Sequence, residues 1–507
     1  MLATVLSSAL LGIDATIVEV EVDLGRGLPQ LQIVGLPEAA VRESRERVRS
    51  AIRNSGYEFP AERTTINLAP ADLKKEGSAY DLPIALGLLA ASGKLPPERL
   101  AEHVVLGELS LDGRVKPVRG ALAVADAAAA RGLRRLVLPA ANAREAALVS
   151  GVEVYGVASL GEAVEFVRGA VALEPCRFDP RRAAAQTTRP AVDLAEVRGQ
   201  QHAKRALEVA AAGGHNLLLV GPPGAGKTML AMRIPTILPE PTLAEAIEIT
   251  KIHSVAGLLD GEPVLGVRPF RTPHHTISAA GLVGGGPVPR PGEVSLAHNG
   301  VLFLDELPEF PRHVLEVLRQ PMEERRVTVS RAHGSLTFPA GFVLVAAMNP
   351  CPCGFLGDPR RACRCVPAEI RRYRGRVSGP LLDRIDLQVE APALLPNEIR
   401  GGSAGESSAE VRYRVDRART RQLERFAGKR IPFNSQMGAR DLRSHCGLDS
   451  AGERLLDAAM QRLHLSARAY GRVLKIARTI ADLDGQDRIL AAHVAESIQY
   501  RALDRSP

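Results

Sequence analysis

The 507-residue chain has no tryptophan, and aromatic residues make up only 4% of it. Proteins that grip single strands by base stacking need aromatic platforms, so this mode of recognition is disfavoured. Any contact with nucleic acid should therefore be made to backbone phosphates. Lysine is also scarce, so arginine carries most of the net charge of +8. That charge permits a polyanionic partner without requiring one.

Long hydrophobic runs are missing too. No apolar run approaches the roughly 20 residues that a membrane helix needs. The first 22 residues have no basic segment before their apolar run and soon gain charges, which argues against a secretory signal. The alternation of Ile17, Val18, Val20 and Val22 instead predicts a strand. We therefore expect a cytoplasmic protein that makes no membrane contact.

The length predicts about three domains. Over residues 1–170, short β-type runs alternate with Ala-rich helical segments, which predicts an α/β domain. Residues 171–192 are rich in Arg, Pro and Thr without periodicity, and we interpret them as a linker. Residues 193–397 form a second α/β unit. The last segment, 398–507, is helical by period and composition after a Gly- and Ser-rich joint.

A phosphate loop, GPPGAGKT, lies between a short apolar strand and a helical run. Its residues are the predicted nucleotide-binding set: Gly221, Pro222, Pro223, Gly224, Ala225, Gly226, Lys227 and Thr228. Backbone N–H groups of such a loop enclose phosphate oxygens, and the helix N-terminus adds attraction for the anion. Lys227 should contact the β- and γ-phosphates, and Thr228 should bind Mg²⁺.

Two further buried strands end in polar residues. VLFLDE places Asp305 to hold Mg²⁺ and Glu306 to polarise an attacking water. FVLVAAMNP places Asn349 as a sensor of the water or γ-phosphate. In isolation, an Asp-Glu pair would be a strand-end cap and Asn349 a turn former. The phosphate loop favours the catalytic interpretation and predicts an ATPase.

In this order the motifs resemble those of the AAA+ ATPases, a fold with a P-loop core and a helical C-terminal lid. The resemblance implies that Arg384, in GPLLDRIDL, acts in trans on a neighbour's nucleotide, although alone it would be interpreted as an internal ion pair. SARAYGRVLKIART resembles the second-sensor helix, with Arg468 favoured over Arg472. A trans-acting arginine implies a ring, usually a homohexamer.

The wide spacing of the motifs narrows the family. Residues 252–300 are too long for a bare helix-to-strand crossover and must include an insert, and 313–342 predicts a helix followed by a hairpin. Together with FRTPHHTIS, MNPCPCG and SGPLLDRIDL, these features resemble the magnesium chelatase-like family.

That resemblance implies an ATP-hydrolysing hexameric DNA translocase or helicase. Such a motor would promote branch migration of single-stranded and branched DNA during homologous recombination in natural transformation. The alternative that the family allows is an ATP-driven remodeller of a protein partner. Arg331 and His333 lie on the hairpin, where they would touch a DNA phosphate or form a solvated tip.

The N-terminal segment 69–146 resembles the proteolytic domain of Lon protease, a fold of the ribosomal S5 domain 2 type. On that alignment the nucleophile position falls on Ala79, with Ser78 one residue early, and the lysine position falls around Leu122 to Val124. Without a base, a serine stays a weak nucleophile. We therefore expect the fold without the peptidase chemistry, as a scaffold for oligomerisation or for the entrance of DNA.

Four of the six cysteines follow Asn349 in a C-x-C-x₉-C-x-C pattern: Cys351, Cys353, Cys363 and Cys365. Disulfides are uncommon in the cytoplasm. Four thiolates at this spacing predict a structural Zn²⁺, with reduced free thiols as the alternative. The adjacent His274 and His275 point differently, so a two-ligand metal site from them is disfavoured; a turn, or a contact at the pore or subunit interface, is expected instead.

Overall fold

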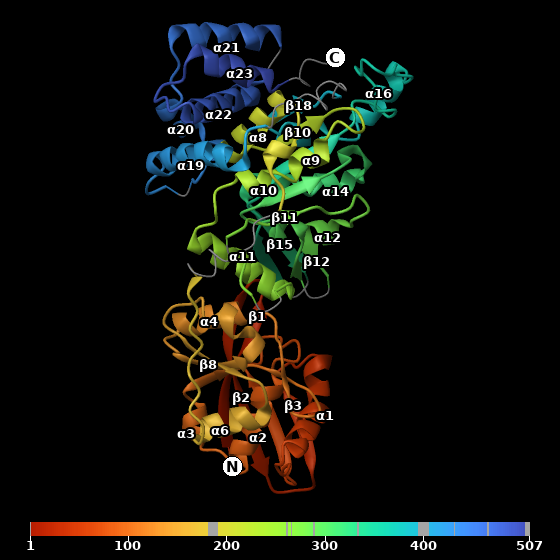
Figure 1. The fold of residues 1–507 in the computed structure, drawn as a ribbon. Helices are drawn as coiled ribbons and strands as arrows, with labels where there is room; N and C mark the ends of the chain where they lie inside the picture. The colour runs from red at the N-terminus through yellow and green to blue at the C-terminus, as the bar shows by residue number, and fades with distance from the viewer. Residues whose placement is uncertain are drawn as a thin grey trace.

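The computed structural model describes residues 2–180, 191–259, 262–264, 266–286, 289–331, 334–393, 405–429, 431–463 and 466–501. The chain forms three blocks stacked along one long axis (Figure 1). The N-terminal block lies at one end, the phosphate-loop block in the middle, and a group of helices at the other end. Residues 181–190 of the proposed linker, and the proposed boundary at 397/398, lie outside the described residues.

The N-terminal block is built on a seven-stranded mixed sheet with the order β3-β4-β2-β1-β5-β8-β9. Its strands are β1 (Leu2–Leu11), β2 (Asp14–Gly25), β3 (Gln30–Val34), β4 (Arg63–Ala69), β5 (His103–Val105), β8 (Arg135–Pro139) and β9 (Glu153–Val157). A small ribbon pairs β6 (Glu108–Leu109) with β7 (Val115–Lys116). The helices are α1 (Ala39–Asn54), α2 (Asp81–Ala91), α3 (Pro97–Leu100), α4 (Ala121–Ala130), α5 (Ala143–Ala146) and α6 (Leu160–Arg168). Every residue of α2 is buried, and all of them except Asp81 are apolar or glycine.

The middle block is a five-stranded parallel sheet with the order β11-β14-β17-β10-β18. Its strands are β10 (Leu217–Val220), β11 (Phe270–Arg271), β14 (Val301–Leu304), β17 (Val343–Met348) and β18 (Leu387–Glu390). β10, β14 and most of β17 are buried, which explains their unbroken apolar sequences. The helices are α8 (Gln201–Gly213), α9 (Lys227–Ala231), α10 (Ile234–Ile237), α11 (Leu243–Ala256), α14 (Arg312–Glu316), α15 (Arg319–Glu324), α16 (Pro367–Arg374) and α17 (Gly379–Leu382).

Two additions decorate this sheet. The first, between β11 and β14, holds α12 (Ala279–Val283), the short pair β12 (Gly284–Gly285) and β13 (Arg290–Pro291), and α13 (Glu293–Leu296). The second is the predicted hairpin of β15 (Arg326–Arg331) and β16 (Gly334–Pro339). The C-terminal helices are α19 (Ser408–Arg425), α20 (Ala439–His445), α21 (Ser450–Arg462), α22 (Ala467–Leu483) and α23 (Ala491–Gln499).

The N-terminal block meets the middle block through α4 and α11. Lys251 on α11 forms ion pairs with Asp14 at 2.7 Å and Asp126 at 2.8 Å. Beside them, Leu122 and Ala246 share a small apolar cluster. The turn between β1 and β2 also approaches the hairpin, and Ile13 packs on the core that contains the hairpin strands. The N-terminal block is therefore attached both to α11 and to the β15–β16 hairpin.

The structure confirms the predicted fold, an AAA+ α/β core with C-terminal helices. The helical segments expected among residues 1–170 occur as α1, α2 and α4. Two details differ. Where the sequence predicts one strand near the N-terminus, the structure has two long antiparallel strands, β1 and β2, joined by a tight turn. The gap between the motifs contains a core strand, β11, as well as the insert. Among the described residues, no helix has both the length and the hydropathy that crossing a membrane requires.

Candidate nucleotide site and cysteine cluster

The predicted nucleotide residues converge at the carboxyl edge of the parallel sheet. The phosphate loop follows β10, Asp305 follows β14, and Asn349 follows β17. The Thr228 hydroxyl donates to the Asp305 carboxylate at 2.6 Å, so the two predicted Mg²⁺ ligands lie together. The Lys227 ammonium donates to the Asn349 amide oxygen at 3.1 Å. Parallel strands bring their carboxyl ends to one edge, where open α/β sheets bind ligands.

Glycines in the loop meet two different constraints. Gly224 and Gly226 have φ values of 76° and 83°, in the left-handed region that favours glycine. Gly221 instead lies against the strand-end backbone, where an added Cβ would lie 2.1 Å from the carbonyl oxygen of Ala391. The loop thus needs glycine for its turns at two positions and for close packing at a third.

Lys227 is the buried cation of the site. Its ammonium donates to the carbonyls of Gly221 at 2.7 Å and Pro222 at 3.0 Å. Burial lowers the pKa of Lys227, and the nearby Asp305 and Glu306 carboxylates oppose that shift. A compact ammonium in this position can exchange its carbonyl partners for phosphate oxygens. The donor set fits a nucleoside triphosphate with Mg²⁺.

Glu306 is exposed at the mouth of the site, and its neighbour is a residue that sequence reasoning did not place there. The backbone of Glu306 is left-handed, with φ 51°. The Nδ1 atom of His275 lies 3.8 Å from the Glu306 carboxylate. His275 reaches this position because it follows β11, which lies beside β14. The His274 ring packs against it with a tilt of 34° and ring centroids 4.1 Å apart. The histidine pair therefore adjoins the predicted catalytic carboxylate.

Arg384 lies at the opposite, amino edge of the sheet. It comes three residues before β18, whose Leu387 pairs with Leu217 at the start of β10. Its guanidinium donates to the carbonyl of Pro380 at 2.6 Å and pairs with Glu323 of the same chain. The length of β10 thus separates Arg384 from its own phosphate loop. The internal ion pair, which was the alternative interpretation of this residue, is present, and Arg384 lies away from the phosphate loop of its own chain.

The second-sensor candidates lie on α22, which faces the same amino edge. Arg472 approaches Asp386 at 3.6 Å and Asp383 at 3.9 Å. Arg468, one turn earlier, is exposed. Burial raises the pKa of Asp386, but the hydrogen bond from His215 and the charges of His215 and Arg472 outweigh it and hold the pKa below its usual value. Neither α22 arginine joins Lys227 and Asp305 at the carboxyl edge.

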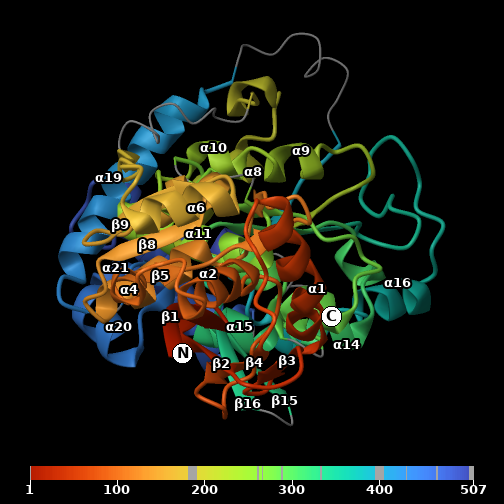
Figure 2. The ribbon, with the colours of Figure 1, turned by 90° about the horizontal axis from the view of Figure 1, so that it is seen from below.

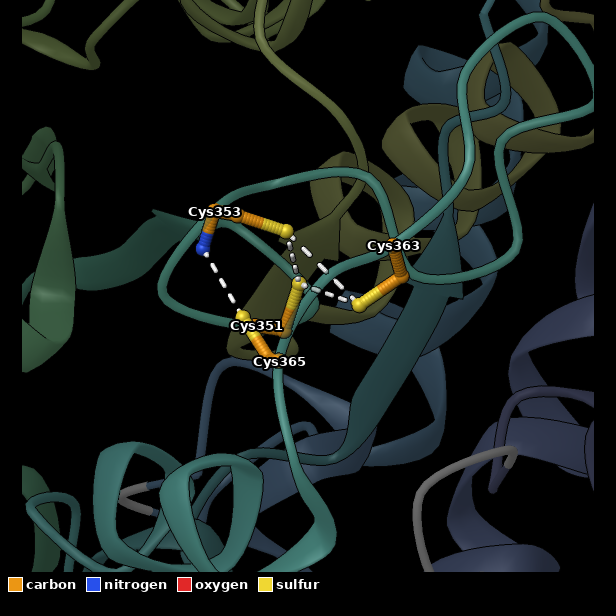
Figure 3. Close-up of side chains that lie close together, drawn as sticks. All are labelled: Cys351, Cys353, Cys363 and Cys365. Atoms are coloured by element: carbon orange, nitrogen blue, oxygen red, sulfur yellow. Dashed lines mark hydrogen bonds between the residues drawn. The ribbon is translucent and has the colours of Figure 1, made fainter.

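The four clustered cysteines come together in space (Figure 3). The sulfur of Cys351 lies 3.4 Å from that of Cys353 and 3.7 Å from that of Cys363, and Cys353 lies 3.6 Å from Cys363. All four sulfurs lie within 4.8 Å of one another. Tetrahedral Zn²⁺ with Zn–S bonds of about 2.3 Å requires sulfur separations of about 3.8 Å. The arrangement therefore fits a structural zinc ion.

The cysteine loop packs on the nucleotide site. Gly354 has φ 84°, and a Cβ added there would lie 2.6 Å from the ring of Pro223 in the phosphate loop. The Arg374 guanidinium, at the end of α16, donates to the carbonyl of Pro350 at 3.2 Å, directly after Asn349. The loop thus supports both the phosphate loop and the sensor strand.

The remaining predicted sites are the peptidase-like positions of the N-terminal block and the tip of the hairpin. At the peptidase-like positions, Leu122 and Val124 are buried in apolar surroundings, and the hydroxyl of Ser78 donates to Glu108 rather than to an amine. The aligned positions therefore supply no lysine to act as the base of a Ser-Lys pair. Arg331 ends β15, and His333 lies outside the described residues.

Three family models match the chain. They describe the magnesium chelatase subunit ChlI (residues 193–399), the subunit ChlI of magnesium chelatase (20–142), and the ChlI C-terminal region (405–501). Similar curated proteins include the competence protein ComM of Haemophilus influenzae, 46% identical over 99% of this chain and 98% of that protein. The uncharacterized protein YifB of Escherichia coli is 47% identical over the same shares. A Lon protease of Chloroflexus aurantiacus is 32% identical over 26% of this chain and 16% of its own length.

Proposed function

The chain belongs to the magnesium chelatase family of AAA+ ATPases, and on that basis we propose that it is an ATP-hydrolysing DNA motor. It would act as a homohexameric translocase or helicase in the cytoplasm and promote branch migration during recombination in natural transformation. The observation that carries the proposal is the full-length similarity to a competence protein. It is supported by the position of the phosphate loop and of Arg384 at opposite edges of the sheet.

In this proposal the carboxyl edge of the sheet binds ATP with Mg²⁺, and Mg²⁺ would supply charge neutralisation on the phosphates. Lys227 holds the β- and γ-phosphates, while Thr228 and Asp305 hold the metal. Glu306 orients and deprotonates the attacking water, and Asn349 fixes the position of that water. Their existing contacts at 2.6 Å and 3.1 Å support these roles, because they already hold the metal ligands and the sensor in place.

The proposal also requires a neighbouring subunit. Arg384 lies at the amino edge, away from the phosphate loop of its own chain, and Arg468 lies on α22 one turn before Arg472, which approaches Asp386 at that edge. In a closed ring, this edge of one subunit faces the nucleotide of the next. Arg384 would then release Glu323 and stabilise the charge of the transferring phosphoryl group. Hydrolysis would therefore depend on assembly.

The test is conversion of a synthetic four-way DNA junction in the presence of ATP. We expect unmodified protein to move the branch point and Lys227→Ala to leave the junction intact. The second candidate, a remodeller of a protein partner, is favoured by the ChlI matches. On that alternative, DNA would leave both the junction and the ATPase rate unchanged, while a protein partner would raise the rate.

A further inference from the structure

The cysteine loop and α16 form a strongly basic projection. We call residues 351–376 the cysteine projection; it carries seven arginines against two acidic residues, Asp358 and Glu369. The seven are Arg360, Arg361, Arg364, Arg371, Arg372, Arg374 and Arg376. α16 lies at the periphery of the middle block in both Figure 1 and Figure 2, apart from the β15–β16 hairpin.

Part of this charge has partners within the chain. Arg360 pairs with Asp358 at 3.4 Å, and Arg376 pairs with Glu309 at 2.9 Å. Arg361 lies over the ring of Phe355 at 4.5 Å, and Arg374 donates to the carbonyl of Pro350. These four arginines help to hold the projection in its conformation.

The other three arginines are not held by ion pairs with described residues. Arg364, Arg371 and Arg372 are exposed, and none forms an ion pair with a residue that the structure describes. Arg371 and Arg372 project from α16, and Arg364 lies between two clustered cysteines. Exposed like charges repel one another, so this grouping is unfavourable without an anionic partner. Guanidinium groups match phosphate oxygens in bidentate geometry, which makes phosphates a suitable partner.

We propose that the cysteine projection binds the phosphate backbone of a DNA arm, through Arg364, Arg371 and Arg372, at a surface separate from the hairpin. This inference rests on the proposed function. A branched substrate has more arms than the central channel of one ring can hold. A second phosphate-binding surface would give the motor a contact for another arm. The absence of tryptophan and the low aromatic content suit a contact made by charge alone.

The projection is also connected to the nucleotide site. Arg376 contacts Glu309, three residues after Glu306, and Arg374 contacts Pro350, next to Asn349. DNA bound on the outer face of α16 would therefore lie close to two catalytic motifs. This arrangement predicts that losing the contact lowers DNA-stimulated hydrolysis and leaves basal hydrolysis unchanged.

The test compares three triple variants in binding of forked DNA across a salt series from about 50 to 200 mM. The first, R364Q/R371Q/R372Q, removes the proposed contacts. The second, R42Q/R45Q/R53Q, removes three exposed arginines from α1 and is the matched charge control. The third, R364K/R371K/R372K, keeps the charge and reports on folding. Sedimentation and thermal unfolding are measured for each.

We expect the first variant alone to bind forked DNA about tenfold or more weakly, with a salt slope reduced by roughly 2 to 3, as the loss of three duplex phosphate contacts requires. The lysine variant should recover most of the binding. Equal binding by the first two variants would overturn the inference and leave the proposed function standing. Loss of ring assembly in the first variant would also overturn it, because the surface would then contact a second copy of the chain. If unmodified protein bound no DNA, both proposals would fail.

Discussion

Gly354 tests whether the cysteine loop supports the phosphate loop. Replacing it by alanine has two consequences. At φ 84° an L-residue is strained by about 1 kcal/mol. The new Cβ would also lie 2.6 Å from the Pro223 ring, where ordinary carbon contacts are about 3.5–4.0 Å. Pro223 or the loop must therefore move by about 1 Å, and a displacement of that size near a reacting group can cost up to about 100-fold in rate.

Gly357 provides the matched control. It lies in the same loop with φ 80°, but an alanine Cβ there would meet nothing within 4 Å. Both variants should lose the stability that backbone strain costs, and Gly354→Ala should lose more because of its added clash. Only Gly354→Ala should lower kcat/KM for ATP, by about tenfold or more, while Gly357→Ala stays within about threefold of unmodified protein. Equal kinetics for the two variants would refute the coupling between the cysteine loop and the phosphate loop.

Three further predictions follow from the site. Lys227→Ala and Arg384→Ala should each abolish hydrolysis. In rings formed from an equal mixture of the two variants, about a quarter of the sites should be active, because each site combines groups from two neighbouring subunits. ATPase assays of the mixed rings measure this fraction, and no recovery of activity would argue against action in trans. Metal analysis should find about one zinc ion per chain. Cys363→Ser should remove the zinc and lower the melting temperature, whereas the control Cys176→Ser should do neither. Equal zinc content in both variants would contradict the site. The folded-state pKa of Asp386 lies below its unfolded value of 3.8, so its stabilisation is present above that value and is lost as the pH falls through the folded-state pKa. The melting-temperature difference between unmodified protein and Asp386→Asn should therefore shrink as the pH falls from about 7 to about 3.

The carboxyl-edge site could be predicted because each of its groups directly follows a buried apolar strand. Lys227, Asp305 and Asn349 are far apart in sequence, but the parallel-strand rule places them together, and the structure does so. Arg384 could be placed at the far edge by the same reasoning, because it precedes its strand. Periodicity also identified the long helices of the N-terminal and C-terminal blocks.

Other features depend on contacts that leave no local signal. His275 reaches Glu306 only because β11 joins the sheet, and a strand of two residues has no detectable period. The contact between Gly354 and Pro223 joins residues about 130 positions apart and is invisible in either motif. The cysteine spacing suggested a metal site, but the approach of all four sulfurs to within 4.8 Å of one another could be seen only in the structure.

In the proposed function, ATP hydrolysis is coupled to DNA. The most direct measurement is the steady-state ATPase rate of unmodified protein with and without forked DNA, at several salt concentrations, with Lys227→Ala as the background. We expect a higher rate with DNA, and a stimulation that weakens as salt rises because the contacts are to phosphates. A rate that forked DNA leaves unchanged at every salt concentration, above a Lys227-dependent basal activity, would contradict it.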